Sequence, residues 1–116
     1  MKRILIADDS KTALIFIERI VLHLFPEAQV IRASSGEEAL EHLDSAEMDL
    51  VLLDHNMGGM TGIECGEQIL AQRPGTRVVL CTANVQRGVR DRAQGCGLLF
   101  VEKPLNPKKL AAVLGV

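Results

Sequence analysis

The chain has 116 residues, 47% of them apolar, and its 13 Lys and Arg against 15 Asp and Glu give a formal net charge of −2. This length predicts one domain, residues 1–116, that is large enough to bury its own core. The charge balance argues against a mainly electrostatic nucleic-acid binder, and an aromatic content of 3% argues against stacking on exposed bases. No apolar run approaches the roughly 20 residues of a membrane span, and Asp8 ends the N-terminal apolar run too early for a signal peptide.

The cysteines indicate a reduced compartment. Cys65, Cys81 and Cys96 are odd in number and form no Cys-x-x-Cys pair, which argues against a disulfide framework and against a zinc site. We therefore expect a cytoplasmic protein with no membrane partner and no direct nucleic-acid partner.

Short apolar runs alternate along the chain with longer stretches of helical period. In chain order, the predicted strand and helix pairs are Ile4–Ala7 with Thr12–Phe25, Gln29–Ala33 with Glu37–Ala46, Leu50–Leu53 with Ile63–Gln72, Arg77–Cys81 with Val85–Gln94, and Leu98–Val101 with Pro107–Leu114. Repeated strand-then-helix units predict a parallel sheet covered by helices on both faces, and continuously apolar strands are typical of such sheets. The predicted fold class is α/β, a doubly wound five-stranded parallel sheet of the flavodoxin-like order 2-1-3-4-5, with a short last helix.

Capping signals support several of these helix boundaries. Ser35-Gly-Glu-Glu38 and Thr61-Gly-Ile-Glu64 both have the Ser/Thr-x-x-Glu pattern of a capping box. Pro107 suits the first turn of the last helix, where its missing N–H has no helical partner anyway.

The first helix is apolar on nearly all its faces. Its expected buried stripe consists of Leu14, Ile17, Val21 and Leu24. Further apolar residues fall on other faces, namely Ile15, Phe16, Ile20 and Leu22. A neighbouring helix could cover them, but the last helix has only about two turns. We therefore expect exposed apolar surface here, as a contact for a partner or for a second copy of the chain.

Polar side chains follow four of the five predicted strands. Asp8 and Asp9 follow the first strand, and Asp54 follows the third. Thr82 follows the fourth strand, and Lys103 comes shortly after the fifth. Because ligand groups collect at the carboxyl ends of the strands in a doubly wound sheet, we expect these side chains to converge on one crevice.

The charges at this crevice point to phosphoryl chemistry with a metal ion. Three crowded carboxylates are unstable unless they are protonated or neutralised, and Mg²⁺ binds carboxylates together with phosphate oxygens and water. Mg²⁺ and Lys103 together would supply three positive charges against three negative ones. A carboxylate can attack phosphorus, and phosphoryl transfer needs mainly positioning and charge stabilisation, which Thr82 and Lys103 would supply.

Each of these residues also has an ordinary structural explanation. Asp8-Asp9 suits a helix N-terminus and Asp54 the start of a loop. Thr82 suits a helix cap, and Lys103 a solvated surface charge. Their joint convergence favours the functional interpretation. Other enzyme classes fit less well, because the chain lacks the Asp-x-Asp of dehalogenase-like phosphatases, the Gly-x-x-x-x-Gly-Lys-Ser/Thr of P-loop hydrolases and the Gly-x-Gly-x-x-Gly of dinucleotide-binding domains.

At these positions the sequence resembles the receiver domains of bacterial two-component response regulators, including single-domain chemotaxis-type regulators. The matching segments are Ile4–Ser10, Leu50–Met57, Met60–Gly62, Cys81–Ala83 and Phe100–Pro104. They span almost the whole chain, and their order and spacing are jointly specific.

The resemblance implies that Asp54 accepts a phosphoryl group from a phosphohistidine, in a Mg²⁺-dependent reaction. It implies that Asp9 and Asp54 bind Mg²⁺ directly, that Asp8 acts mostly through water, and that Asn56 contributes its backbone carbonyl. The chain would then be a signalling domain that catalyses only its own phosphorylation and dephosphorylation, rather than an enzyme acting on other substrates.

The resemblance also assigns the switch. Thr82 and Lys103 would contact the phosphoryl oxygens, and Phe100 falls where the family places a switch aromatic that turns inward as Thr82 moves. A cis peptide bond is expected between Lys103 and Pro104. One departure is Gly58-Gly59, where the family usually has proline after methionine. We expect that loop to be more mobile and the metal site less pre-organised.

The implied partners are proteins: a sensor histidine kinase or a histidine phosphotransfer protein upstream, and a target protein downstream. We also expect a homodimer, through the first helix or through the face formed by the fourth helix, fifth strand and fifth helix. One alternative is a receiver-like docking module that works without phosphorylation. No helix-turn-helix follows the receiver portion. We therefore expect either a stand-alone regulator that acts by protein contact or, as another alternative, the excised receiver of a longer transcription regulator.

Overall fold

Strands and helices alternate along the whole chain in the computed structural model, which describes residues 2–83 and 87–116. The elements are β1 Arg3–Ala7, α1 Lys11–Leu24, β2 Gln29–Ala33, α2 Gly36–Ser45, β3 Leu50–Leu53, α3 Gly62–Gln72, β4 Arg77–Thr82, α4 Arg87–Gly95, β5 Leu99–Glu102 and α5 Pro107–Leu114. The predicted elements are therefore confirmed to within a residue or two at their described ends. The expected start of the fourth helix at Val85 lies outside the described residues.

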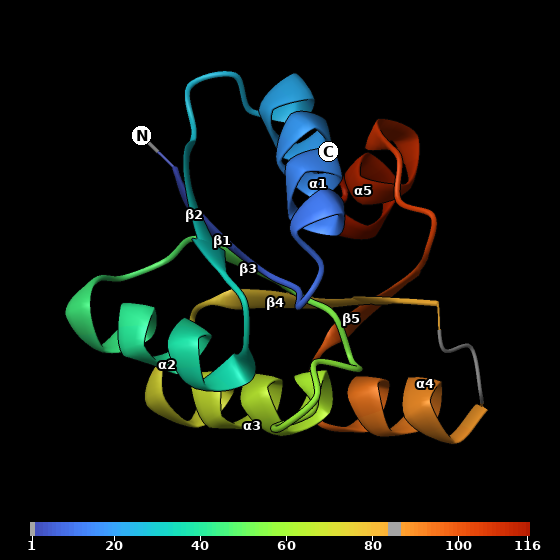
Figure 1. The fold of residues 1–116 in the computed structure, drawn as a ribbon. Coiled ribbons are helices and arrows are strands. Elements are labelled where there is room, and N and C mark those ends of the chain that lie inside the picture. Colours follow the sequence, from blue (N-terminus) through green and yellow to red (C-terminus); the bar gives the residue numbers. More distant parts are fainter. Residues whose placement is uncertain (1, 84–86) are drawn as a thin grey trace.

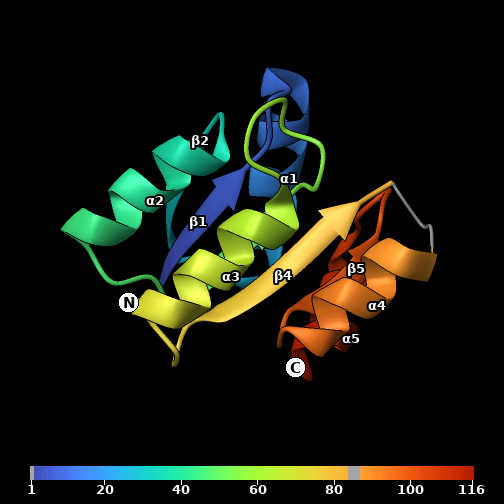
Figure 2. The same ribbon diagram turned by 90° about the horizontal axis from the view of Figure 1, so that it is seen from below.

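The strands form one parallel sheet in the order β2-β1-β3-β4-β5, which confirms the predicted α/β fold class. Helices α1 and α5 lie on one face of this sheet, and α2, α3 and α4 lie on the other (Figure 1). Seen from that second face, α2, α3 and α4 cover the sheet side by side (Figure 2). Because all strands run the same way, their carboxyl ends share one edge, where the loops into the helices begin.

The core has two halves, one on each face of the sheet. Successive strand side chains point to opposite faces, so Ile4 and Ile6 of β1 pack toward α1 and α5, whereas Leu5 and Ala7 pack toward α2 and α3. Residues on both faces of β1 and β3 are buried. This double burial explains why these strands are continuously apolar rather than alternating.

Side-chain caps begin four of the helices, and one of the two predicted capping boxes is complete. Thr61 accepts a hydrogen bond from the Glu64 N–H, and the Glu64 carboxylate accepts one from the Thr61 N–H. The prediction of a second box is wrong in one half. The Ser35 hydroxyl accepts from the Glu38 N–H, as predicted. The Glu38 carboxylate, however, accepts from the hydroxyl and the N–H of Ser34 instead of the Ser35 N–H, because Ser34 offers it two donors.

Helix α1 leaves part of its apolar surface in solvent, as its sequence predicts. Ile15 is 45% exposed and Phe16 is 49% exposed. Ile20 is an exception to the prediction, because it is buried with the main stripe between α1 and the sheet. The short helix α5 contacts α1, but it does not reach far enough to cover Ile15 and Phe16.

The buried cysteines belong to the core. Cys65 and Cys81 lie in the two different halves of the core, and both are buried. Burial raises the pKa of the Cys65 thiol to about 12 and that of the Cys81 thiol to about 11, so both stay protonated at neutral pH. These thiols pack as small apolar groups.

The described helices include none with the length and apolar character needed to cross a membrane.

We expect Gly62→Ala to destabilise the protein and Gly88→Ala to stabilise it. A Cβ at Gly62 would lie 2.4 Å from the Asp54 carbonyl oxygen and 2.5 Å from Leu80 Cδ1, and overpacking of this kind costs about 2–3 kcal/mol. A Cβ at Gly88 in α4 meets no atom of the described residues within 4 Å, so alanine there should gain up to about 1 kcal/mol of helix propensity. Urea unfolding of the two variants and the parent measures both effects. Equal unfolding free energies for the two variants would contradict this packing.

Candidate phosphoryl and metal site

The residues predicted to form the site come together at the carboxyl edge of the sheet. Backbone hydrogen bonds continue the strand ladders into them: the Asp8 N–H donates to the Ala33 carbonyl at 3.1 Å, and the Asp54 N–H donates to the Ala7 carbonyl at 3.0 Å. The ends of β1 and β3 are therefore held by the sheet itself. The predicted convergence is a consequence of strand order and parallel direction.

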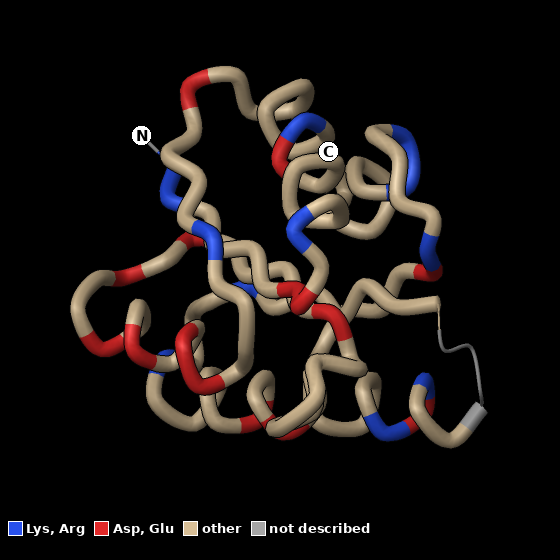
Figure 3. Tube along the Cα trace, in the orientation of Figure 1, with Lys and Arg blue, Asp and Glu red and all other residues tan. Residues whose placement is uncertain are grey.

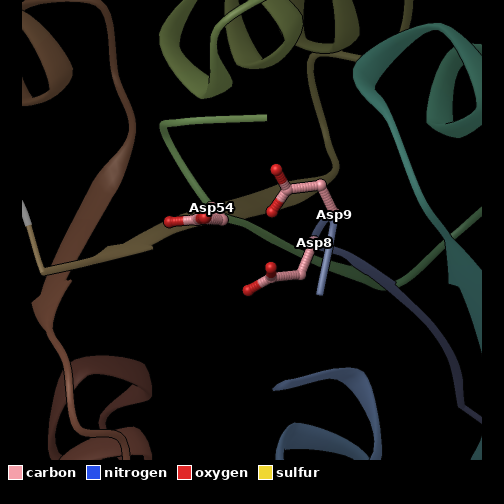
Figure 4. Close-up of side chains that lie close together, drawn as sticks. All are labelled: Asp8, Asp9 and Asp54. Atoms are coloured by element: carbon pink, nitrogen blue, oxygen red, sulfur yellow. The ribbon is translucent and has the colours of Figure 1, made fainter. Parts of the chain in front are cut away.

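Three carboxylates from these two strand ends lie close together. Asp8, Asp9 and Asp54 each offer an oxygen within 4.8 Å of the others, and their side chains gather around one space (Figure 4). Asp8 is buried, Asp54 is half-buried and Asp9 is exposed. Such crowding of negative charge is unfavourable unless cations or protons compensate it.

Among the described residues, Lys103 is the cation that faces this cluster. Its ammonium donates a hydrogen bond to Asp8 Oδ2 at 2.7 Å and lies 3.7 Å from Asp54 Oδ1. Partial burial works to lower the pKa of Lys103, but the hydrogen bond to Asp8 and the charges of Asp54 and Asp8 outweigh it and leave that pKa raised. Lys103 is therefore firmly protonated at neutral pH.

Asp54 responds to the same surroundings in the opposite direction. Burial is the largest influence and raises its pKa, the Lys103 charge works to lower it, and the neighbouring Asp8 charge raises it again. The net shift is upward, although the His55 N–H also donates to Asp54 Oδ1 at 2.9 Å. In the protein alone, the Asp54 carboxylate thus lacks full compensation of its charge.

The oxygen cluster fits a hard divalent cation. Two ligands of one Mg²⁺ lie at most about 4.2 Å apart, which is twice the usual Mg–O distance of roughly 2.1 Å. A spread of up to 4.8 Å among the carboxylates is therefore compatible with two direct ligands and a third that acts through water. Since Asp8 already holds the Lys103 ammonium and also accepts from the Ser10 N–H at 3.0 Å, it is the member with least freedom to bind metal directly.

Thr82 and Phe100 lie on the strands next to the cluster. Thr82 ends β4 and is buried, and its carbonyl accepts a hydrogen bond from the Lys103 N–H at 3.0 Å. Phe100 of β5 pairs with Leu80 of β4, so Phe100 and Thr82 are on the same face of the sheet. The Phe100 ring is half-buried, and the Arg90 guanidinium of α4 lies over it at 5.7 Å from its centroid.

The loop after Asp54 contains Asn56 and the glycine pair. Gly58 has a positive φ of 82°, a conformation that glycine adopts without strain. The Met60 N–H donates to Glu37 Oε1 of α2 at 3.2 Å, and Met57 is buried in the core. Two side-chain contacts therefore restrain a loop that has no proline, and its expected mobility stays a prediction. No local pattern points to Glu37, because it lies 23 residues from Met60 in sequence.

The segment between β5 and α5 carries Lys103 and is held by a second lysine. The expected cis peptide bond between Lys103 and Pro104 is confirmed. The Lys109 ammonium donates to the Pro104 carbonyl at 2.9 Å and to the Glu102 carbonyl at 3.3 Å. Lys109 is not among the residues predicted from the sequence. The only available signal is a lysine in the first turn of a helix, where the helix dipole disfavours it.

An apolar groove of about 320 Å³ adjoins the site on the α1 side. Its lining residues are Ala13, Phe16, Ile17, Ala83, Lys103, Pro104 and Leu105. The exposed apolar surface of α1 is thus continuous with the segment that carries Lys103.

Comparison with known proteins agrees with this arrangement. Residues 4–115 match the family model of the response regulator receiver domain. The chain is 33% identical over 115 residues to the chemotaxis protein CheY of Listeria monocytogenes, with 98% of this chain and 96% of that protein covered.

Solved structures show the same fold. The CheY-like receiver domain protein of Methanospirillum hungatei is 27% identical, with a TM-score of 0.89 over 99% of this chain and 91% of that one. The response regulator TrrA of Thermotoga maritima, solved in complex with Mg²⁺ and BeF, is 27% identical, with a TM-score of 0.85 over 99% of this chain and 97% of that one. The chain belongs to the response regulator receiver domain family, the phosphorylation-dependent switches of two-component signalling.

Proposed function

We propose that this receiver domain accepts a phosphoryl group on Asp54 from the phosphohistidine of a sensor histidine kinase or a histidine phosphotransfer protein. The observation that carries the proposal is the cluster of three carboxylates around one space, with the Lys103 ammonium 3.7 Å from Asp54. The family match over residues 4–115 supports treating residues 1–116 as one such domain.

We assign each site residue a role, and the clustering of Asp8, Asp9 and Asp54 supports the metal-binding part of it. Asp9 and Asp54 would hold Mg²⁺ directly, Asp8 through water, and Asn56 through its backbone carbonyl. Bound Mg²⁺ would neutralise the charge that the incoming phosphoryl oxygens bring to the cluster. Since Asp8 orients the Lys103 ammonium, its contribution does not depend on contact with the metal.

The transfer itself needs little more than positioning. An oxygen of Asp54 forms a bond to phosphorus as the bond from phosphorus to the donor nitrogen breaks, and the freed imidazole leaves with its electron pair. The Lys103 ammonium and the Thr82 hydroxyl would hold the phosphoryl oxygens. Attack of water on the same phosphorus later releases phosphate and regenerates Asp54, so the domain turns over only its own phosphoryl group.

Phosphorylation would signal through the face formed by α4, β5 and α5. Thr82 and Phe100 share one face of the sheet, so movement of Thr82 toward the phosphoryl group frees space on the Phe100 side. Basic residues predominate on α4, whereas acidic residues gather on α2 (Figure 3). A downstream target protein would therefore meet a basic surface beside Phe100. The net charge of −2 supports neither a nucleic-acid nor a membrane partner, and a cytoplasmic location stays a prediction.

Incubation with acetyl phosphate and Mg²⁺ should add one phosphoryl group to the chain, as measured by intact mass. The adduct should be absent from Asp54→Asn and from wild-type protein treated with EDTA, because the acceptor or the metal is missing. Lys103→Met should slow its formation at least tenfold, since a charge-assisted contact to the phosphoryl group is lost. An adduct that persists in Asp54→Asn would contradict the proposed acceptor.

Asp54→Asn should also stabilise the metal-free protein at pH 7. The pKa of Asp54 is raised in the folded state above its usual 3.8, so folding favours the protonated carboxyl. This group therefore contributes stability below about pH 4, and the contribution is lost as the pH rises through the raised pKa of the folded state. The gain from Asp54→Asn should therefore shrink as the pH falls below about 4. Urea unfolding in EDTA at both pH values measures it, with the exposed Asp44→Asn as control. An equal gain at both pH values would show that charge is not its source.

The exposed apolar residues of α1 lead us to expect a homodimer, either through α1 or through the face formed by α4, β5 and α5. Light scattering with and without beryllofluoride, a phosphoryl mimic, would measure its mass. If α1 forms the contact, Phe16→Ala should return the dimer to a monomer, while Glu41→Ala, at an exposed position of α2 on the opposite face of the sheet, should not. A dimer unaffected by Phe16→Ala would favour the other face, and a monomer in both states would exclude both contacts.

A further inference from the structure

The first turn of helix α5 carries positive charges that do not favour the stability of the helix. Lys108 and Lys109 occupy its first turn, and no acidic residue accompanies them there. The N-terminal end of a helix carries partial positive charge, so cations in the first turn are unfavourable. A local feature that opposes helix stability is often retained for a function elsewhere.

The position of the Lys109 ammonium indicates that function. It donates to the carbonyls of Glu102 and Pro104, which flank Lys103 on both sides, at 3.3 and 2.9 Å. The Lys109 backbone N–H meanwhile donates to the Asn106 cap at 2.7 Å, which fixes the start of the helix from which the side chain reaches back. Lys108, one position earlier, is exposed.

These contacts act on the backbone that presents Lys103. On one side, the Lys103 N–H donates to the Thr82 carbonyl and is held by β4. On the other side, the chain leaves the sheet and turns toward α5, where the Lys109 ammonium bridges the two carbonyls. The Lys103 ammonium then lies 2.7 Å from Asp8 and 3.7 Å from Asp54, at the end of a long and otherwise adaptable side chain.

We propose that Lys109 is a positioning residue, which fixes the backbone on either side of Lys103 and so directs the Lys103 ammonium at the Asp54 phosphoryl site. This inference rests on the proposed function, in which Lys103 binds the phosphoryl group. Among the described residues, the Lys109 ammonium hydrogen-bonds to two backbone carbonyls, and it does not touch the reacting atoms. It therefore acts on phosphorylation through Lys103 alone.

The first test is a double-mutant cycle on the rate of phosphorylation by acetyl phosphate at saturating Mg²⁺, measured by intact mass. Lys109→Met should slow the reaction about threefold, the effect of losing a partly exposed charged hydrogen bond. The matched control Lys108→Met should leave the rate unchanged. In the Lys103→Met background, Lys109→Met should cause no further loss, because the residue through which it acts is gone.

A second measurement needs neither metal nor phosphodonor. In metal-free protein with ¹⁵N-labelled lysine, the hydrogen-bonded Lys103 ammonium should exchange its protons with water slowly enough to be followed by NMR. Lys109→Met should speed that exchange at least threefold, while Lys108→Met should leave it unchanged. Urea unfolding of both variants confirms that folded proteins are compared.

The outcomes separate the two proposals. If Lys109→Met matches Lys108→Met in rate and in ammonium exchange, or slows the reaction as much without Lys103 as with it, the positioning role is overturned. If Lys103→Met phosphorylates at the wild-type rate, the role of Lys103 in the proposed function fails. The exchange measurement still decides whether Lys109 holds Lys103 in place.

Discussion

The repulsion among three carboxylates at one edge of the sheet is the constraint on which the rest of the site depends. Parallel strand order places Asp8, Asp9 and Asp54 within 4.8 Å of one another, and Lys103 is the cation that the structure brings against two of them. One ammonium cannot neutralise three carboxylates. Burial is the main cause of the raised pKa of Asp54, and the Asp8 charge adds to it, so the Lys103 charge does not offset the two. The cluster therefore favours the binding of further positive charge, and a divalent cation would supply it in the form that oxygen ligands prefer.

The sheet fixes only part of this arrangement. Ladder hydrogen bonds reach Asp8, Asp54 and the Lys103 N–H, but the loops beyond them have left the sheet. Long side chains from helices on opposite faces hold those loops: Glu37 of α2 bonds to the loop after β3, and Lys109 of α5 to the segment after β5. The strand ends thus position the acids and Thr82, whereas Lys103 lies in a segment beyond β5 that a helix side chain holds in place.

This division also explains what could be predicted from the sequence. Strand direction and the convergence of the strand ends follow from local apolar runs and from rules that hold for any doubly wound sheet. The contact of Glu37 depends on where a loop 23 residues away in sequence lies in the fold. The contact of Lys109 depends on the shape of the turn between β5 and α5. The second capping box failed for a similar reason, since Ser34 and Ser35 both offered partners to Glu38 and only the three-dimensional geometry decides between them.

The two distances from Lys103 explain how such a site can work as a switch. The ammonium is hydrogen-bonded to Asp8 at 2.7 Å and lies farther from Asp54, at 3.7 Å. A phosphoryl group on Asp54 would bring new anionic oxygens close to the Lys103 ammonium. These oxygens would compete with Asp8 for that cation. Because a ligand shifts an equilibrium only through contacts that differ between states, this competition provides the required difference. The Lys103 N–H is bonded to the Thr82 carbonyl and its flanking carbonyls to Lys109, so displacement of Lys103 would reach both β4 and α5.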